Sequence, residues 1–102
     1  MSATLTEQEF SKHLNTRFRL AAEDTIELEL TEVKGYLSQA HEQAGMERFS
    51  ALFHGPADRK LPQRVYTLQH AAMGEFDLFL VPIGKDERGF RYEAVFNYFR
   101  EA

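Results

Sequence analysis

Four histidines are the residues of this 102-residue chain best suited to bind a metal ion or to transfer a proton near neutral pH. A local metal site needs two ligands at i, i+2 on a strand or at i, i+4 on a helix. The spacing of His13, His41, His54 and His70 offers no such pair. His54 and His70 each end a predicted strand, so only these two could converge in space.

Other residue types that carry out catalysis lack the local sequence that they need. No serine lies in a Gly-x-Ser-x-Gly elbow, and the glycines form neither a Gly-x-Gly-x-x-Gly nor a Gly-Lys-Ser/Thr phosphate loop. The absence of cysteine excludes disulfides, thiolate metal sites and a cysteine nucleophile, and it fits a reducing compartment. We therefore predict no catalytic residue, no metal site and no cofactor.

Glu93 lies between Tyr92 and Ala94 in the last predicted strand, an aromatic setting for a carboxylate, and it could pair with Arg64 or Arg91. An enzyme that uses His54, His70 and Glu93 is consequently the weakest of three functional hypotheses. It requires the three side chains to lie within hydrogen-bonding or ligand distance of one another.

The charge balance argues against binding to nucleic acid. The chain has 12 Lys and Arg against 16 Asp and Glu, a net charge of −4, whereas a protein that binds the phosphate backbone normally has a basic face. No apolar run reaches the ~18 residues of a membrane helix. The first residues lack the positive and apolar regions of an export signal. We expect a cytoplasmic protein that binds neither nucleic acid nor membrane.

Alternation of apolar and polar side chains with a period of two predicts a single domain over residues 1–102 that is mainly β. The short links contain no crossover helix, which favours antiparallel strands. Six strands with one apolar face must bury it, so we expect a curled sheet, either a small barrel or a sandwich, over about 16–99. The strands are predicted at 17–20, 26–31, 48–54, 64–70, 76–83 and 90–99, with a loop at 35–47.

An N-terminal helix over about 6–14 is predicted from a capping box formed by Thr6 and Glu9. Phe10 and Leu14 give this helix an apolar stripe. Because so short a helix is marginal alone, we expect it to dock on the sheet and cap one end of it.

Aromatic residues make up 13% of the chain, as nine Phe and four Tyr, and they are concentrated in the last two strands. In residues 76–83, Phe79, Val81 and Ile83 face away from the neighbouring apolar set, and Val95 repeats this pattern in the last strand. This second apolar face needs cover, either from the N-terminal helix or from another molecule. Phe79, Val81, Ile83 and Val95 are therefore the predicted interface with a protein partner or a second copy in a homodimer.

A curled sheet could instead enclose a pocket for a small ligand. Phe53, Tyr66, Tyr92 and Phe96 would line such a pocket, and the protein would then be a β-barrel carrier. A filled interior would argue against this alternative.

Four motifs resemble a family of short bacterial proteins classed as a domain of unknown function: LFHGP at 52–56, LPQ with YTLQH at 61–70, LFLVPIG at 78–84 and YEAVFN at 92–97. The resemblance implies a bacterial cytosolic protein, and we associate the family with genes for phage-tail-collar-like proteins. It brings no catalytic residues. The leading hypothesis is a non-enzymatic structural or protein-interaction module, accessory to a phage-tail-like assembly.

Overall fold

The computed structural model describes residues 5–23, 25–35 and 46–99. In chain order the elements are α1 (Glu7–Ser11), β1 (Arg17–Leu20), β2 (Glu27–Gly35), β3 (Met46–His54), β4 (Arg64–His70), β5 (Gly74–Asp86) and β6 (Gly89–Phe99). The predicted loop at 35–47 falls almost wholly on residues 36–45, which lie outside the described residues. No helix in the described part of the chain is long and apolar enough to cross a membrane.

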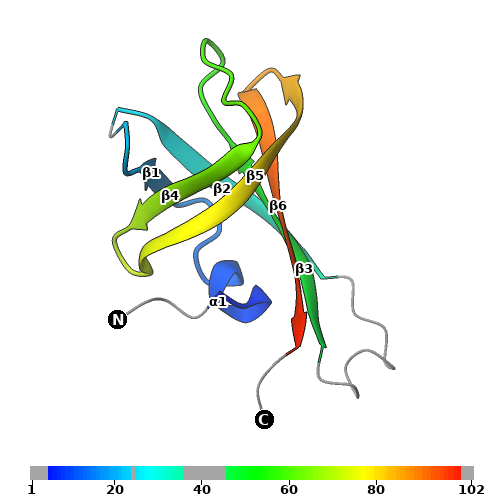
Figure 1. Ribbon diagram of the computed structural model, residues 1–102. Helices are drawn as coiled ribbons and strands as arrows, with labels where there is room; N and C mark the ends of the chain where they lie inside the picture. The colour runs from blue at the N-terminus through cyan, green and yellow to red at the C-terminus, as the bar shows by residue number, and fades with distance from the viewer. Residues whose placement is uncertain (1–4, 24, 36–45, 100–102) are drawn as a thin grey trace.

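The six strands form one antiparallel sheet that closes on itself in the order β1-β2-β3-β6-β5-β4. The expected mainly β fold with six antiparallel strands is confirmed, and of the two arrangements considered the strands adopt the closed barrel (Figure 1). Strand β5 connects two parts of the ring, because Gly74–Leu80 pair with β4 and Val81–Asp86 pair with β6.

The ring is closed by a short pairing between β1 and β4. Strand β1 has four residues and pairs with β4 only through Arg19 opposite Gln69 and Leu20 opposite Leu68. One further backbone hydrogen bond, from the N–H of Ala21 to the carbonyl of Thr67, extends this pairing. The first half of β4 therefore has β5 on one side and none of the described strands on the other.

The predicted helix is present but shorter than expected, over Glu7–Ser11 rather than about 6–14. Thr6 caps it as predicted, since its side chain accepts a hydrogen bond from the N–H of Glu9 at 3.1 Å. The reciprocal half of the capping box is replaced, because the Glu9 carboxylate instead contacts Lys12 and His13 at 3.4 and 3.3 Å. At the other end, a positive φ of 66° at Asn15 turns the chain toward β1.

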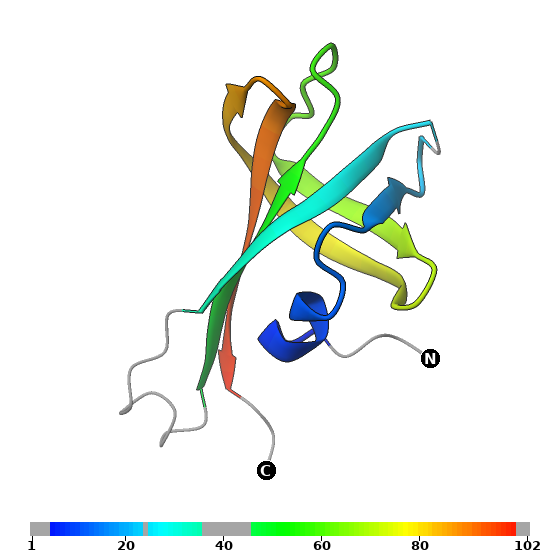
Figure 2. The same ribbon diagram turned by 180° about the vertical axis from the view of Figure 1, so that it is seen from behind.

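Helix α1 lies at one open end of the ring, beside the long end of β3, as both views show (Figures 1 and 2). Its one buried residue, Phe10, has ring centroids 5.4–6.4 Å from those of Phe18, Phe49, Phe76 and Phe96. Much of the aromatic surplus thus packs around the helix. The helix therefore docks at one end of the sheet as expected, with Phe10 in the core.

The inward positions of the strands fill the interior of the barrel. Phe18, Leu28, Leu30, Phe53 and Leu80 are fully buried, and they belong to one continuous core cluster with Phe10. This core orients the strands, so that the residues between these positions lie on the outer surface.

Candidate functional site

The outer face of β4, β5 and β6 carries the largest exposed apolar side chains of the sheet. Val95 is 64% exposed, Val65 59%, Phe79 49% and Ile83 42%. The alternation predicted for β5 is confirmed, since Phe76, Leu78 and Leu80 are buried while Phe79 and Ile83 are exposed. The helix does not supply cover for this second face, because it lies at one open end of the ring and directs Phe10 into the core. We call Val65, Phe79, Val81, Ile83 and Val95 the outer apolar face.

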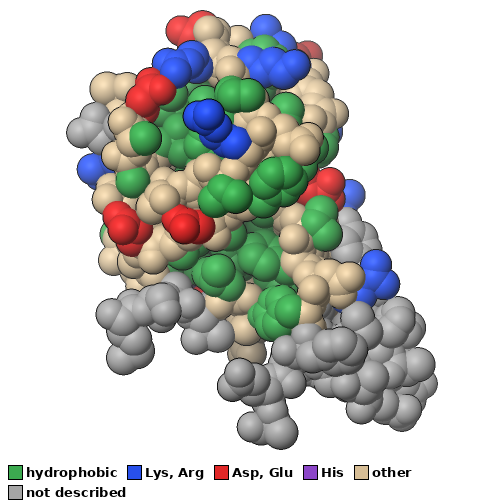
Figure 3. Space-filling view, in the orientation of Figure 1, with side chains coloured by type: hydrophobic (Ala, Val, Ile, Leu, Met, Phe, Trp, Pro, Cys, Tyr) green, Lys and Arg blue, Asp and Glu red, His purple; other side chains and the backbone are tan. Residues whose placement is uncertain are grey.

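Strand pairing places these side chains near one another. Val65 lies directly opposite Phe79 in the β4–β5 pair, and Val81 lies opposite Glu93 in the β5–β6 pair. Cross-strand partners have Cβ atoms about 4.5–5.5 Å apart, so Val65 lies beside Phe79, and Val81 lies beside Glu93. Glu93 is in turn two residues before Val95 on the same face of β6. Figure 3 shows hydrophobic side chains gathered across this side of the molecule. Patches of this kind on a small protein are typical of contact sites.

Two opposite charges flank the outer apolar face without a partner in the described part of the chain. Glu93 lies two residues before Val95 on β6. Asn97 lies two residues after Val95 and pairs with Arg48 on β3. Neither Glu93 nor Arg48 forms an ion pair with another described residue, so the predicted pairing of Glu93 with Arg64 or Arg91 is not made.

The four aromatics predicted to line a ligand pocket lie in different surroundings. Phe53 and Tyr92 are fully buried, and the Tyr92 hydroxyl accepts a hydrogen bond from the N–H of Leu61 at 2.8 Å. Phe96 stacks on Phe49 with centroids 4.4 Å apart. Tyr66 alone of the four lines the cleft that lies beside β4. The carrier function remains a prediction.

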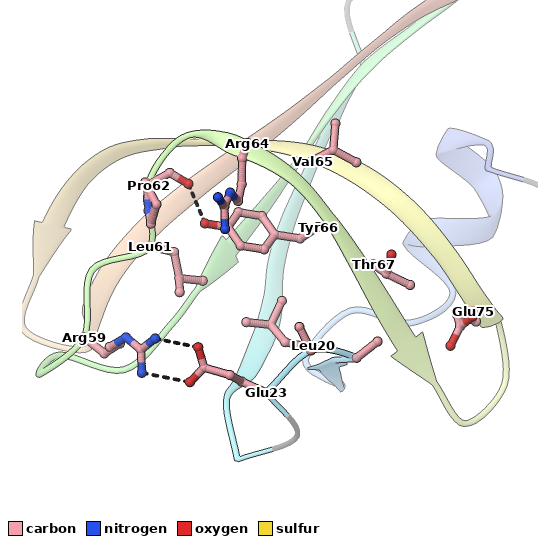
Figure 4. Close-up of a pocket in the computed structure, with 12 residues that line it drawn as sticks. Leu20, Glu23, Arg59, Leu61, Pro62, Arg64, Val65, Tyr66, Thr67 and Glu75 are labelled. Atoms are coloured by element: carbon pink, nitrogen blue, oxygen red, sulfur yellow. Dashed lines mark hydrogen bonds and ion pairs between the residues drawn. The ribbon is translucent and has the colours of Figure 1, made fainter.

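The cleft beside β4 has a volume of about 500 Å³ and lies where β1 ends (Figure 4). Leu20 and Leu61 are buried beneath it. The Tyr66 hydroxyl donates a hydrogen bond to the carbonyl of Pro62 at 2.5 Å, and burial raises the pKa of this phenol. The guanidinium of Arg64 lies 5.9 Å from the centroid of the Tyr66 ring.

Strand β3 brings His54 to a polar cluster beside the β5–β6 turn. Its Nε2 lies 2.8 Å from Asp86 Oδ2, and its Nδ1 lies 3.2 Å from Thr31 Oγ1. The hydrogen bond from His54 lowers the pKa of the Asp86 carboxyl. The order of hydroxyl, imidazole and carboxylate is that of a nucleophilic triad. Thr31 Oγ1 also lies 3.3 Å from the carbonyl of Leu52, to which it can donate, so the cluster links β2 and β3 to the β5–β6 turn.

His70 lies in a different cluster, against the segment that follows helix α1. Its Nε2 is 2.9 Å from Thr16 Oγ1, and its ring is 4.7 Å from that of His13. His54, His70 and Glu93 share no hydrogen bond or ion pair, so the geometry that the enzyme hypothesis requires is not present. Neither histidine belongs to a group of three or more possible metal ligands within the described residues.

Sequence reasoning missed Val65 and Arg48 as surface residues of interest, and it considered Arg64 only as a partner for Glu93. Val65 had a readable signal, because it alternates with Tyr66 and Leu68 in a predicted strand and therefore had to face outward. Whether Arg48 and Arg64 have a carboxylate nearby depends on the order of the strands in the sheet, and no local sequence pattern predicts that order.

A family model described as "Domain of unknown function (DUF6916)" matches residues 5–96. No curated protein and no solved structure matches the chain. The function therefore has to be inferred from the surface itself.

Proposed function

The chain belongs to this family of unknown function through residues 5–96, and on that premise we propose that it is a non-enzymatic structural module that associates through its outer apolar face. The occupant of this face that we propose is a second copy of the same chain. The observation that carries the proposal is the exposure of large apolar side chains on outward positions of three adjacent strands.

The hydrophobic effect supplies the driving force. Burial of apolar surface contributes roughly 25 cal/mol per Å², and residues such as Phe79 and Val95 leave about half or more of their surface in water in the single chain. Sheets pack face to face with their strands within about 30° of alignment, which suits an outer face made of strands.

The arrangement of charge favours a second copy over an unrelated protein. In a two-fold contact the same patch meets itself. If Val95 lies at the axis and β6 faces its own copy antiparallel, Glu93 meets Asn97 and Arg48 of the partner subunit. Each contact then forms two ion pairs between charges that have no ion-pair partner among the described residues of the single chain.

A role as an accessory to a phage-tail-like assembly in bacteria is the specific setting that we propose, and the motifs described above support it. Symmetric assemblies are commonly built from small subunits with self-complementary faces. The proposal of self-association does not depend on this setting.

Sedimentation velocity of the purified chain over a dilution series tests the proposal. We expect a dimer that dissociates on dilution and a monomer for Val95→Lys, which places a charge on the outer apolar face. Leu14→Lys is the matched control, because Leu14 is another exposed apolar residue, 39% exposed, that lies outside this face. It should leave the dimer intact.

A charge exchange tests the orientation. Arg48→Glu and Glu93→Arg should each weaken the dimer by ~5-fold or more, and the double variant should restore it, because the opposite charges meet again. A wild-type chain that is monomeric at every concentration would overturn the proposed association. A dimer that is indifferent to Val95→Lys would show that another surface is used.

A further inference from the structure

The cleft beside β4 is bordered by an open strand edge. Strand β1 ends at Leu20, and beyond the bond from Ala21 to Thr67 the chain leaves β4. Arg64, Val65 and Tyr66 are paired only with β5. An unpaired edge of this kind presents backbone donors and acceptors to whatever lies beside it.

Val65 carries the free backbone groups. In an antiparallel strand, alternate residues direct their N–H and C=O to the same neighbour. The carbonyl of Thr67 accepts a bond on the β1 side, so Val65, two residues earlier, directs its N–H and C=O to that side as well. No backbone hydrogen bond to a described residue satisfies them there.

The side chains around this edge match an extended segment with an alternating pattern. The floor of the cleft is apolar and is formed by Leu20, Leu61 and Tyr66. Figure 4 shows the Tyr66 ring directed toward Pro62 and Leu61. Arg64 lies on the same face of β4 as Tyr66, two residues away. One apolar and one acidic side chain, two residues apart, would contact both.

Arg64 is the cation available to a ligand. The other arginine of the cleft, Arg59, is held by Glu23 through two hydrogen bonds of 2.9 and 2.5 Å. Within the described residues Arg64 makes no ion pair and only contacts the Tyr66 ring. The cleft therefore has one cation without a carboxylate partner beside its apolar floor.

We propose that this cleft binds an extended peptide segment that adds to the edge of β4 in line with β1. The segment pairs with the backbone of Val65, places an apolar side chain on Tyr66 and brings a carboxylate to Arg64. Strand addition of this kind obtains affinity from the main chain and specificity from alternate side chains. The proposal stands on the cleft alone and does not require self-association through the outer apolar face.

Titration of the ¹⁵N-labelled full chain with the peptide acetyl-Ser-Val-Thr-Asp-Ser-amide tests the proposal by NMR. In the extended form, Val and Asp of this peptide lie on one face and Thr pairs with Val65. We expect saturable shifts that include the Val65 amide and slower hydrogen exchange there. A peptide with Asn in place of Asp should bind ~10-fold more weakly, because the charge-assisted bond is lost.

Two further arms separate the parts of the proposal. A peptide methylated on the Thr nitrogen cannot donate to the Val65 carbonyl, and it should also bind ~10-fold more weakly. Arg64→Gln should remove the preference for Asp over Asn. Arg19→Gln, which removes an exposed arginine of β1 outside the cleft, should retain that preference.

The outcomes are distinct. Equal binding of the methylated and unmethylated peptides would overturn strand addition. Equal shifts with sodium propionate alone would show that the cleft recognises only a small carboxylate. Absence of any shift at cleft residues at millimolar peptide would overturn the site. The spectrum of each variant without peptide should match that of the wild type except near the substituted residue, 64 or 19. This match verifies that the variant is folded.

Discussion

The imidazole of His70 lies against that of His13, with ring centroids 4.7 Å apart. The His70 Nδ1 accepts hydrogen bonds from the backbone N–H groups of Ala72 and Met73 at 3.0 and 3.1 Å. An atom that accepts from two donors carries no proton, so the proton of neutral His70 resides on Nε2, which donates to Thr16. The ring thereby connects the β4–β5 turn to the segment that follows α1.

The stability of the fold should fall in mild acid because of this ring. Burial, followed by the proximity of His13, lowers the pKa of His70 below its ordinary value of about 6.5. The unfolded chain then binds more protons than the folded chain as the pH falls from about 6.5 through the folded pKa. The stabilisation that neutral His70 provides is therefore complete above about pH 6.5 and is lost as the pH falls below it. Urea unfolding at a series of pH values between about 7.5 and 5 would measure this loss in the free energy of unfolding.

His70→Asn is the informative comparison, because an amide oxygen can accept the two backbone N–H groups and does not titrate. The difference in stability between wild type and this variant should shrink as the pH decreases. Parallel pH profiles would show that His70 does not contribute to the acid sensitivity.

The Tyr92 hydroxyl should make a measurable contribution to stability. It is buried and accepts from the N–H of Leu61 at 2.8 Å. Tyr92→Phe leaves that N–H buried without a partner, which costs about 1–3 kcal/mol. Tyr66→Phe removes a hydroxyl at an exposed site and should cost less. Equal losses of the free energy of unfolding in guanidinium would contradict this reasoning.

Much of the fold could be predicted from local pattern. The period of two placed β4 at its observed bounds and located the other five strands, although β5 extends further than the run of apolar residues at 76–83. Its extra residues, Gly74 and Gly84–Asp86 among them, are glycine or polar and are held by pairing with β4 and β6. Such pairing depends on strand order, which a single sequence does not contain.

The candidate sites were harder to predict for the same reason. Phe79 and Val95 were identified because their side-chain direction follows from alternation alone. The separation of His54 from His70, and the open edge at Val65, follow from how the ring closes. Whether the helix covers Phe79 could not be predicted from the sequence. Only the closed ring shows that Phe10 of the helix packs in the core against Phe76, away from the outer face that carries Phe79.

Removal of the Ser50 hydroxyl should not destabilise the protein. Its Oγ is buried without a hydrogen-bond partner in the described structure. An unsatisfied buried hydroxyl costs about 1–3 kcal/mol, so Ser50→Ala should leave the free energy of unfolding unchanged or raise it by about 1 kcal/mol. Ala51→Ser, which buries a new hydroxyl on the inward side of the same strand, should lower it. Loss of stability in Ser50→Ala would indicate that the hydroxyl has a partner in solution.

Gly89 should be the least replaceable glycine of the described chain. Its φ of 139° disfavours any side chain, and a Cβ atom there would overlap the carbonyl oxygen of Gly55. The N–H of Gly55 donates to the carbonyl of Phe90 at 2.8 Å, so the β5–β6 turn and the end of β3 cannot separate without breaking this bond.

Strain and overlap together give an expected loss of about 3 kcal/mol or more for Gly89→Ala. Gly74→Ala is the matched control, because Gly74 also has a positive φ, 82°, but has open space where the Cβ would lie. Backbone strain alone should cost this variant about 1–2 kcal/mol. Thermal unfolding monitored by circular dichroism should therefore show a much larger decrease in Tm for Gly89→Ala. Similar decreases would mean that the turn moves away from Gly55 to accommodate the methyl group.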